Sequence, residues 1–146
     1  MNKDIQFLEQ AIELAMANKG HGGRPFGAVL VKNGQVIATG TNNMLANFDP
    51  SSHAEMEAIR KAATSAKNID LSGSTIYASG QPCPMCLAVI AITNISEIFF
   101  AFDNNDAAPF NFASTSLYNK LKISDVNFVP MKKLKTKYTA AELYSS

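Results

Sequence analysis

The stretch that organises this chain reads PCPMC and occupies positions 82–86. It contains both cysteines of the 146-residue sequence, Cys83 and Cys86. Pro84 suits the first turn of a helix, and the apolar run from Met85 to Ile92 predicts that this helix continues and is buried. Residues three apart share one face of a helical turn, so we expect both thiols to point the same way.

A second short motif, HAE at positions 53–55, lies upstream at the predicted start of another helix. Zinc prefers cysteine sulfur and histidine nitrogen, and three protein ligands leave the fourth corner of its tetrahedron for water. His53 and the two cysteines provide those three ligands. The sequence therefore predicts one zinc ion per chain, held by His53, Cys83 and Cys86, with a bound water or hydroxide.

Glu55 follows His53 by two positions, which places it off the ligand face of a regular helix. At the start of the helix its carboxylate can instead lean over the open corner of the metal. There it can accept a proton from the water and pass protons to a ring nitrogen and to a leaving amine. Glu55 is therefore the predicted catalytic residue.

Three other interpretations of these residues stay open. A Cys-x-x-Cys pair in an α/β protein is also typical of thiol oxidoreductases. His21 lies in a glycine-rich loop and would complete a closed Cys₂His₂ structural site. The third interpretation is a zinc-stabilised nucleic-acid-binding module without catalysis, in which Glu55 would have no role.

Hydrophobic periodicity predicts alternating helices and strands along the chain. Expected helices cover about 3–18, 84–92, 115–121 and 138–144, with one more running to Ala66 from a cap at Ser51 or Ser52. Expected strands cover 28–31, 35–39, 75–78, 98–102 and 126–129. Asn33-Gly34 predicts a hairpin, and the long connection before the last strand suits a crossover between parallel strands. The predicted fold class is α/β: a three-layer α/β/α sandwich with a mixed five-stranded sheet, in one domain spanning 1–146.

Composition favours an ordinary globular domain, with 47% apolar and 17% charged residues. A net charge of +1 gives no general attraction for polyanions. No apolar run is long enough for a membrane span, and the N-terminus lacks the layout of a signal peptide. Two closely spaced cysteines do not make a disulfide framework, so we expect a cytoplasmic location without membrane association.

The paired motifs, His-x-Glu and Pro-Cys-x-x-Cys, are those of zinc-dependent base deaminases. The chain resembles the cytidine deaminase superfamily, and within it the small bacterial guanine deaminases, in blocks at 25–29 (PFGAV), 42–43 (NN), 49–55 (DPSSHAE) and 82–86. This resemblance implies a cytidine deaminase-like fold and zinc-dependent hydrolytic deamination of a nucleobase. Guanine, converted to xanthine and ammonia, is the first substrate that it implies.

The resemblance also implies a substrate site. In similar enzymes, residues matching Asn42 and the backbone of Ala54 hydrogen-bond the base, and the one matching Phe26 walls the pocket. Asp106 and Phe112 resemble residues of the guanine deaminase pocket loop. These five positions are therefore the predicted substrate-binding residues.

The resemblance further implies a homodimer, in which the C-terminal segment, with Tyr144, lies near the partner's site. The chain also departs from its relatives. Gln81 stands where they usually have glutamate, and Ala113 and Ser114 replace two aspartates of the guanine deaminases. Cytosine, isocytosine or another aminated ring therefore stay open as substrates.

The tRNA adenosine deaminases resemble the chain in the same blocks and give the alternative function. Enzymes that hold an anticodon loop tend to carry clustered basic residues. One such cluster occurs here, at Lys132, Lys133, Lys135 and Lys137, although a solvated face near the C-terminus explains it better. The paired asparagines at 42–43 favour a free base, so a small-molecule nucleobase is the expected partner and tRNA the alternative.

Overall fold

The structure is a computed structural model that describes residues 2–123 and 129–145. Within those residues the chain forms one five-stranded sheet in the order β2-β1-β3-β4-β5. The strands are β1 (Gly27–Lys32), β2 (Gln35–Thr41), β3 (Ser74–Gly80), β4 (Glu97–Phe102) and β5 (Met131–Lys133). β1 runs antiparallel to β2 and β3, whereas β4 runs parallel to β3 and β5. The predicted mixed sheet is confirmed.

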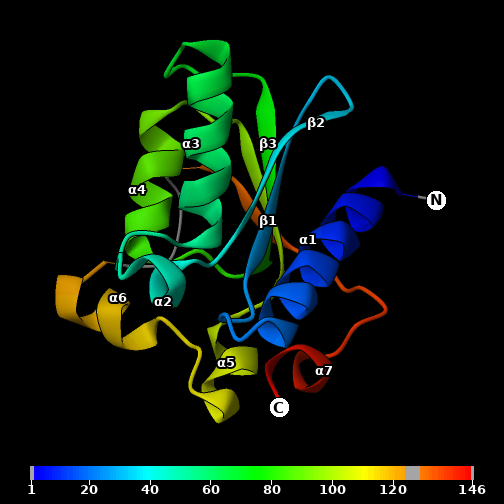
Figure 1. Cartoon of the computed structure of the whole chain (residues 1–146), viewed down its shortest axis with the longest axis vertical. Helices are drawn as coiled ribbons and strands as arrows, with labels where there is room; N and C mark the ends of the chain where they lie inside the picture. Colours follow the sequence, from blue (N-terminus) through cyan, green and yellow to red (C-terminus); the bar gives the residue numbers. More distant parts are fainter. Residues whose placement is uncertain (1, 124–128, 146) are drawn as a thin grey trace.

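Helices cover both faces of this sheet (Figure 1). They are α1 (Lys3–Gly20), α2 (Met44–Asn47), α3 (Ala54–Ala66), α4 (Pro84–Ile92), α5 (Asn104–Ala107), the 3-10 helix η1 (Ala108–Phe110), α6 (Thr115–Leu121) and α7 (Ala140–Tyr144). Alternate strand residues point to opposite faces. Leu30 and Ile76 therefore join the core under α3 and α4, while Val29 and Tyr77 join the core under α1 and α7. The predicted three-layer sandwich is confirmed.

The hairpin between β1 and β2 forms at the predicted residues. Asn33 and Gly34 have φ values of 52° and 74°, the left-handed conformation that a tight two-residue hairpin turn requires. The first helix extends two residues past its predicted end at Asn18, and the predicted helix over 115–121 matches α6. None of the helices in the described ranges is long and apolar enough to cross a membrane.

Two local predictions are wrong. The N-cap of α3 is His53 and not Ser51 or Ser52, because the Ser52 hydroxyl instead donates to Oε2 of Glu57 at 2.7 Å. The helix expected to be buried, α4, buries only one face. Ile92 at its end is 71% exposed, because the sheet and α3 contact the opposite face of the helix.

The last strand lies later than predicted. Of the strand expected over 126–129, residues 126–128 lie outside the described residues. The observed strand β5 begins at Met131 and pairs with β4 in the parallel orientation that the long connection predicted. The short helices α2 and α5 and the turn η1 occupy segments in which the sequence predicted no helix.

Candidate active site

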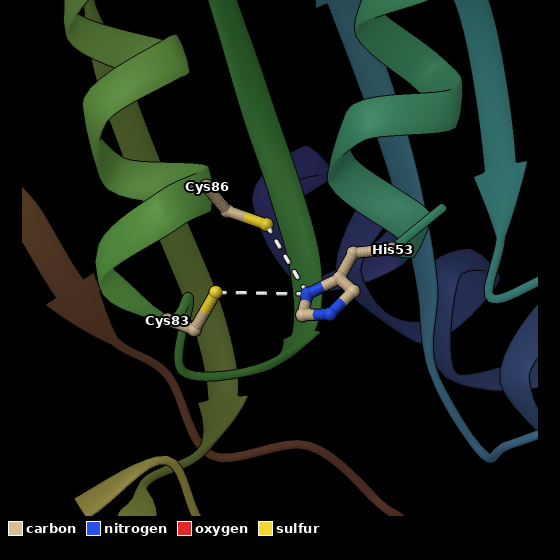
Figure 2. A group of neighbouring side chains, drawn as sticks. All are labelled: His53, Cys83 and Cys86. Carbon is tan, nitrogen blue, oxygen red and sulfur yellow. Dashed lines mark hydrogen bonds between the residues drawn. The ribbon is translucent and has the colours of Figure 1, made fainter. Parts of the chain in front are cut away.

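His53, Cys83 and Cys86 converge between the N-terminal ends of α3 and α4 (Figure 2). Nδ1 of His53 lies 3.6 Å from Sγ of Cys83 and 3.6 Å from Sγ of Cys86. All three ligand atoms lie within 4.8 Å of one another. Nitrogen and sulfur ligands at zinc bonding distances and a tetrahedral angle stand about 3.5 Å apart. The donor types and their spacing therefore fit a zinc ion.

Helix starts hold two of these ligands. His53 is the N-cap of α3, Cys83 is the N-cap of α4, and Pro84 begins that helix as the sequence predicted. Partial positive charge at a helix N-terminus favours thiolates. The hydroxyl of Tyr118, in α6, donates to the carbonyl oxygen of Pro82 at 2.6 Å. This contact fixes the segment that leads into Cys83.

The position of His53 depends on a close approach between β2 and the start of α3. A Cβ at Gly40, in β2, would lie only 2.2 Å from the carbonyl oxygen of Ala54. Only glycine therefore lets the start of α3 approach β2 so closely. On the other side of His53, the hydrogen bond from Ser52 to Glu57 ties the preceding loop to the first turn of the helix.

Glu55 lies beside the metal cluster, the group formed by His53, Cys83 and Cys86, and is not part of that group. Its side chain is 7% exposed, and it hydrogen-bonds with the thiol of Cys86. Burial raises the pKa of its carboxyl to about 7, and the charge of Cys83 adds to that effect. The carboxyl therefore adjoins the cluster at the position where a molecule bound over the metal would meet it.

Hydrogen bonding within the cluster gives the two thiols different pKa values. The thiol of Cys86 lowers the pKa of Cys83 to about 4, while the same bond and burial raise the pKa of Cys86. The bond to Cys83 raises the pKa of His53, which burial and the Arg24 guanidinium oppose. Cys83 is thus a thiolate at neutral pH, the form in which cysteine binds metals.

A pocket of about 180 Å³ opens over the cluster. It is lined by Arg24, Phe26, Asn42, Met44, His53, Glu55, Gln81, Cys83, Asn111, Phe112, Ala113 and Ser114. The structure thus brings three predicted substrate-binding residues, Phe26, Asn42 and Phe112, into one wall with His53 and Glu55. Pockets for drug-sized ligands span roughly 300–1,000 Å³, so this one suits a smaller molecule.

The other two predicted substrate residues, Asp106 and Ala54, are absent from the pocket lining, and only for Ala54 was a backbone contact predicted. Asp106 does not line the pocket, because its carboxylate accepts the backbone N–H of Asp103 and pairs with Lys133 at 2.9 Å. Ala54 is fully buried, and only its backbone, between His53 and Glu55, adjoins the site. Arg24, Met44 and Asn111 line the pocket without having been predicted, since no periodicity or motif distinguishes them.

Tyr144 packs within its own chain. Its ring centroid lies 6.0 Å from that of Phe26 and 5.4 Å from that of Phe112, while these two rings meet edge to face at 5.7 Å. Tyr144 thus lies against the wall of its own pocket, and the position near a partner's site that the resemblance implies stays a prediction. His21 is exposed at the end of α1, and in the described ranges the metal cluster does not include it.

This fold and this site define the chain as a zinc-dependent deaminase. Residues 1–102 match the family model described as the cytidine and deoxycytidylate deaminase zinc-binding region. The chain belongs to that family.

Individual relatives agree with this assignment. Guanine deaminase of Bacillus subtilis is 42% identical over 117 residues, which are 79% of this chain and 74% of that protein. A tRNA-specific adenosine deaminase of Buchnera aphidicola is 39% identical over 99 residues, 68% of this chain and 61% of the relative. The crystal structure of the Bacillus guanine deaminase matches with a TM-score of 0.79 at 36% identity, over 94% of this chain and 88% of that one. The predicted family resemblance, fold class and zinc-dependent deaminase chemistry are confirmed.

Proposed function

We propose that this chain converts guanine to xanthine and ammonia by hydrolytic deamination. One observation carries the proposal: His53 and Cys83 of the three-residue cluster with Cys86 line a small pocket, and Glu55 lines the same pocket. The 42% identity to guanine deaminase of Bacillus subtilis supports guanine as the base.

The reaction replaces the 2-amino group of guanine with oxygen from water. A zinc ion on the three ligands supplies Lewis-acid activation of that water. Glu55 takes one proton from the water as its oxygen attacks C2, and delivers this proton to N3. It then moves the remaining hydroxyl proton to the amine, which leaves as ammonia. One carboxylate thus serves both proton transfers.

Asn42, Phe26 and Phe112 would hold the base. The side chain of Asn42 is oriented within the pocket, because its Oδ1 accepts the backbone N–H of Met44 at 3.1 Å. Asn42 is 4% exposed, so a hydrogen bond to the base would form away from bulk water. The two aromatic rings, which meet edge to face, would form one apolar wall against which the flat ring system packs. The backbone N–H of Ala54, in the first turn of α3, would add a donor, since such groups have no partner within their helix.

Ammonia release from a panel of substrates tests this function. The panel contains guanine, cytosine, isocytosine, adenine, guanosine and a tRNA anticodon stem-loop, each with wild-type protein and with Glu55→Ala as the control for contaminating activity. We expect release from guanine that Glu55→Ala abolishes. Release from another base with none from guanine would overturn the substrate assignment.

Deamination of tRNA adenosine is the second candidate, favoured by the 39% identity to a tRNA-specific adenosine deaminase. The structure gives only partial support to the basic cluster at 132–137 as an RNA contact. Lys133 pairs with Asp103 at 3.1 Å and with Asp106 at 2.9 Å, so its charge is compensated within the chain. The anticodon stem-loop in the panel separates this candidate from the first.

We also propose that residues 1–146 act as a single cytoplasmic domain and assemble as a homodimer through the outer face of α4. That face is apolar and open, since Ala88 and Ile92 are exposed there. Burying such a patch stabilises association. Sedimentation at micromolar concentration should show a dimer, and Ile92→Glu should shift it toward monomer. A wild-type protein that sediments only as a monomer would rule the dimer out.

A further inference from the structure

Arg24 brings a positive charge to the pocket that the deaminase motifs do not account for. Arg24 lines the pocket together with Asn42 and Glu55. Arg24 is exposed, whereas Glu55 is 7% exposed. Arg24 therefore lies at the exposed end of the pocket, whereas Glu55 and Cys83 lie at its buried end.

The backbone of Arg24 is held in place by Asn18, at the end of α1. Nδ2 of Asn18 donates to the carbonyl oxygen of Arg24 at 2.8 Å and to that of Asn42 at 2.8 Å. Gly23 permits this arrangement, because a Cβ there would stand 2.5 Å from the same nitrogen. Arg24 is thus anchored to the strand end that carries the buried asparagine.

The guanidinium has no ionic partner in the part of the chain that the structure describes, where the salt bridges are those of Arg60 and Lys133. Apart from Glu55 and the two residues of the metal site, His53 and Cys83, the polar side chains that line the pocket with Arg24 are neutral: Asn42, Gln81, Asn111 and Ser114. The exposed end of the pocket therefore offers the N–H donors of Arg24, which have no ionic partner there, and no carboxylate. It suits a ligand edge that accepts hydrogen bonds.

Guanine presents such an edge. With its 2-amino group toward the metal cluster, the far side of the ring system carries O6 and N7, two adjacent acceptors. An arginine fork matches this pair, and bidentate donation to O6 and N7 is the commonest arginine contact that proteins use to select guanine in DNA. Adenine has a donor in place of O6, and cytosine has no second ring.

We propose that Arg24 is a specificity-determining residue that donates hydrogen bonds to O6 and N7 of a 6-oxopurine bound in this pocket. The inference rests on the proposed function and assigns the selection of guanine to a residue outside the deaminase motifs. It also explains how the pocket can select guanine although Ala113 and Ser114 carry no carboxylate.

The test combines changes in the protein with changes in the ligand. Wild-type protein and Arg24→Met are compared on guanine and on 7-deazaguanine, which lacks N7. Wild-type kcat/KM should fall about 10- to 100-fold from guanine to 7-deazaguanine, and Arg24→Met should lose a similar factor on guanine. In Arg24→Met the two ligands should be nearly equivalent, because the donor that distinguishes them is gone. Lys61→Met, which removes an exposed cation outside the pocket, should behave as wild type.

Binding gives a second readout that does not depend on turnover. In a Glu55→Ala background, calorimetry should show that Arg24→Met weakens guanine binding about 10- to 100-fold and weakens 7-deazaguanine binding less, because 7-deazaguanine loses only the contact to O6. Circular dichroism should give all variants the same melting temperature. If Arg24→Met weakens both ligands equally, or neither, the Arg24 proposal fails while guanine deamination stands. If wild-type protein releases no ammonia from guanine, both proposals fail.

Discussion

The hydroxyl of Tyr144 lies against Gly80, so closely that a Cβ at position 80 would stand 2.9 Å from the tyrosine oxygen. This hydroxyl is buried and has no hydrogen-bond partner among residues 2–123 and 129–145. The ring of Tyr144 also packs on Phe26 and Phe112, which wall the pocket. The C-terminal helix therefore supports the aromatic wall of the site through a contact that tolerates no side chain at Gly80.

Gly80→Ala should destabilise the protein by about 1–3 kcal/mol, as overpacking of a filled core does. Displacement of Tyr144 should also loosen the pocket wall and raise KM for the base. Tyr144→Phe should be neutral or slightly stabilising, because it removes a buried hydroxyl without a partner. Combined with Gly80→Ala, it should restore part of the lost stability. Urea unfolding of the two single variants and the double variant measures this coupling, and purely additive effects would contradict the contact.

Glu55→Ala should keep its zinc and its fold and lose about 10²- to 10⁴-fold in kcat, because the proton shuttle is removed. Glu55→Gln should fail similarly, since an amide cannot accept the proton of the water. Steady-state kinetics and metal analysis of the same samples provide the measurement. Glu97→Gln is the matched control, because Glu97 is the first residue of β4 and does not line the pocket. Loss of zinc together with activity would instead make Glu55 a metal-site residue.

Purified protein should carry about one zinc per chain. Cys83→Ala should lose most of this zinc and unfold at lower urea concentration, because binding energy of the metal contributes to folding. His21→Ala should retain the metal, since His21 lies outside the cluster. Elemental analysis together with urea unfolding tests both variants. Zinc loss on changing His21 would revive the closed Cys₂His₂ site.

Gly40→Ala should disturb the metal site although position 40 binds nothing. The added Cβ would meet the Ala54 carbonyl at 2.2 Å, so the start of α3 would have to move away. We expect a loss of at least about 1–3 kcal/mol in stability and weaker zinc retention against a chelator. Gly20→Ala is the control, because no atom lies within 4 Å of its Cβ position. Equal zinc retention in the two variants would show that the start of α3 can move without displacing His53 from the metal site.

Some features of this protein are local in the sequence and were predictable for that reason. The ligands Cys83 and Cys86 lie three apart at a helix start marked by Pro84, and the spacing alone places both thiols on one side. The hairpin at Asn33-Gly34 follows from the backbone conformations that these two residues adopt readily. Zinc chemistry follows from the identities of the donors.

Other features depend on which of several possible partners a side chain meets. Ser52 was a reasonable helix cap by residue type, but Glu57 takes its hydroxyl. Asp106 resembled a pocket residue, yet Lys133, which only the parallel pairing of β5 with β4 brings near, draws it into an ion pair. The residue types alone could not distinguish these alternatives.

The motifs at 53–55 and 82–86 by themselves determined the metal ligands and the carboxylate beside them, because coordination chemistry depends on donor type and short spacing. Only the tertiary structure decided what surrounds them. Arg24 reaches the pocket because Asn18 joins its loop to Asn42, and Tyr144 supports the wall because Gly80 leaves room for its hydroxyl. These contacts join residues far apart in the chain, and their geometry depends on packing that no local pattern encodes.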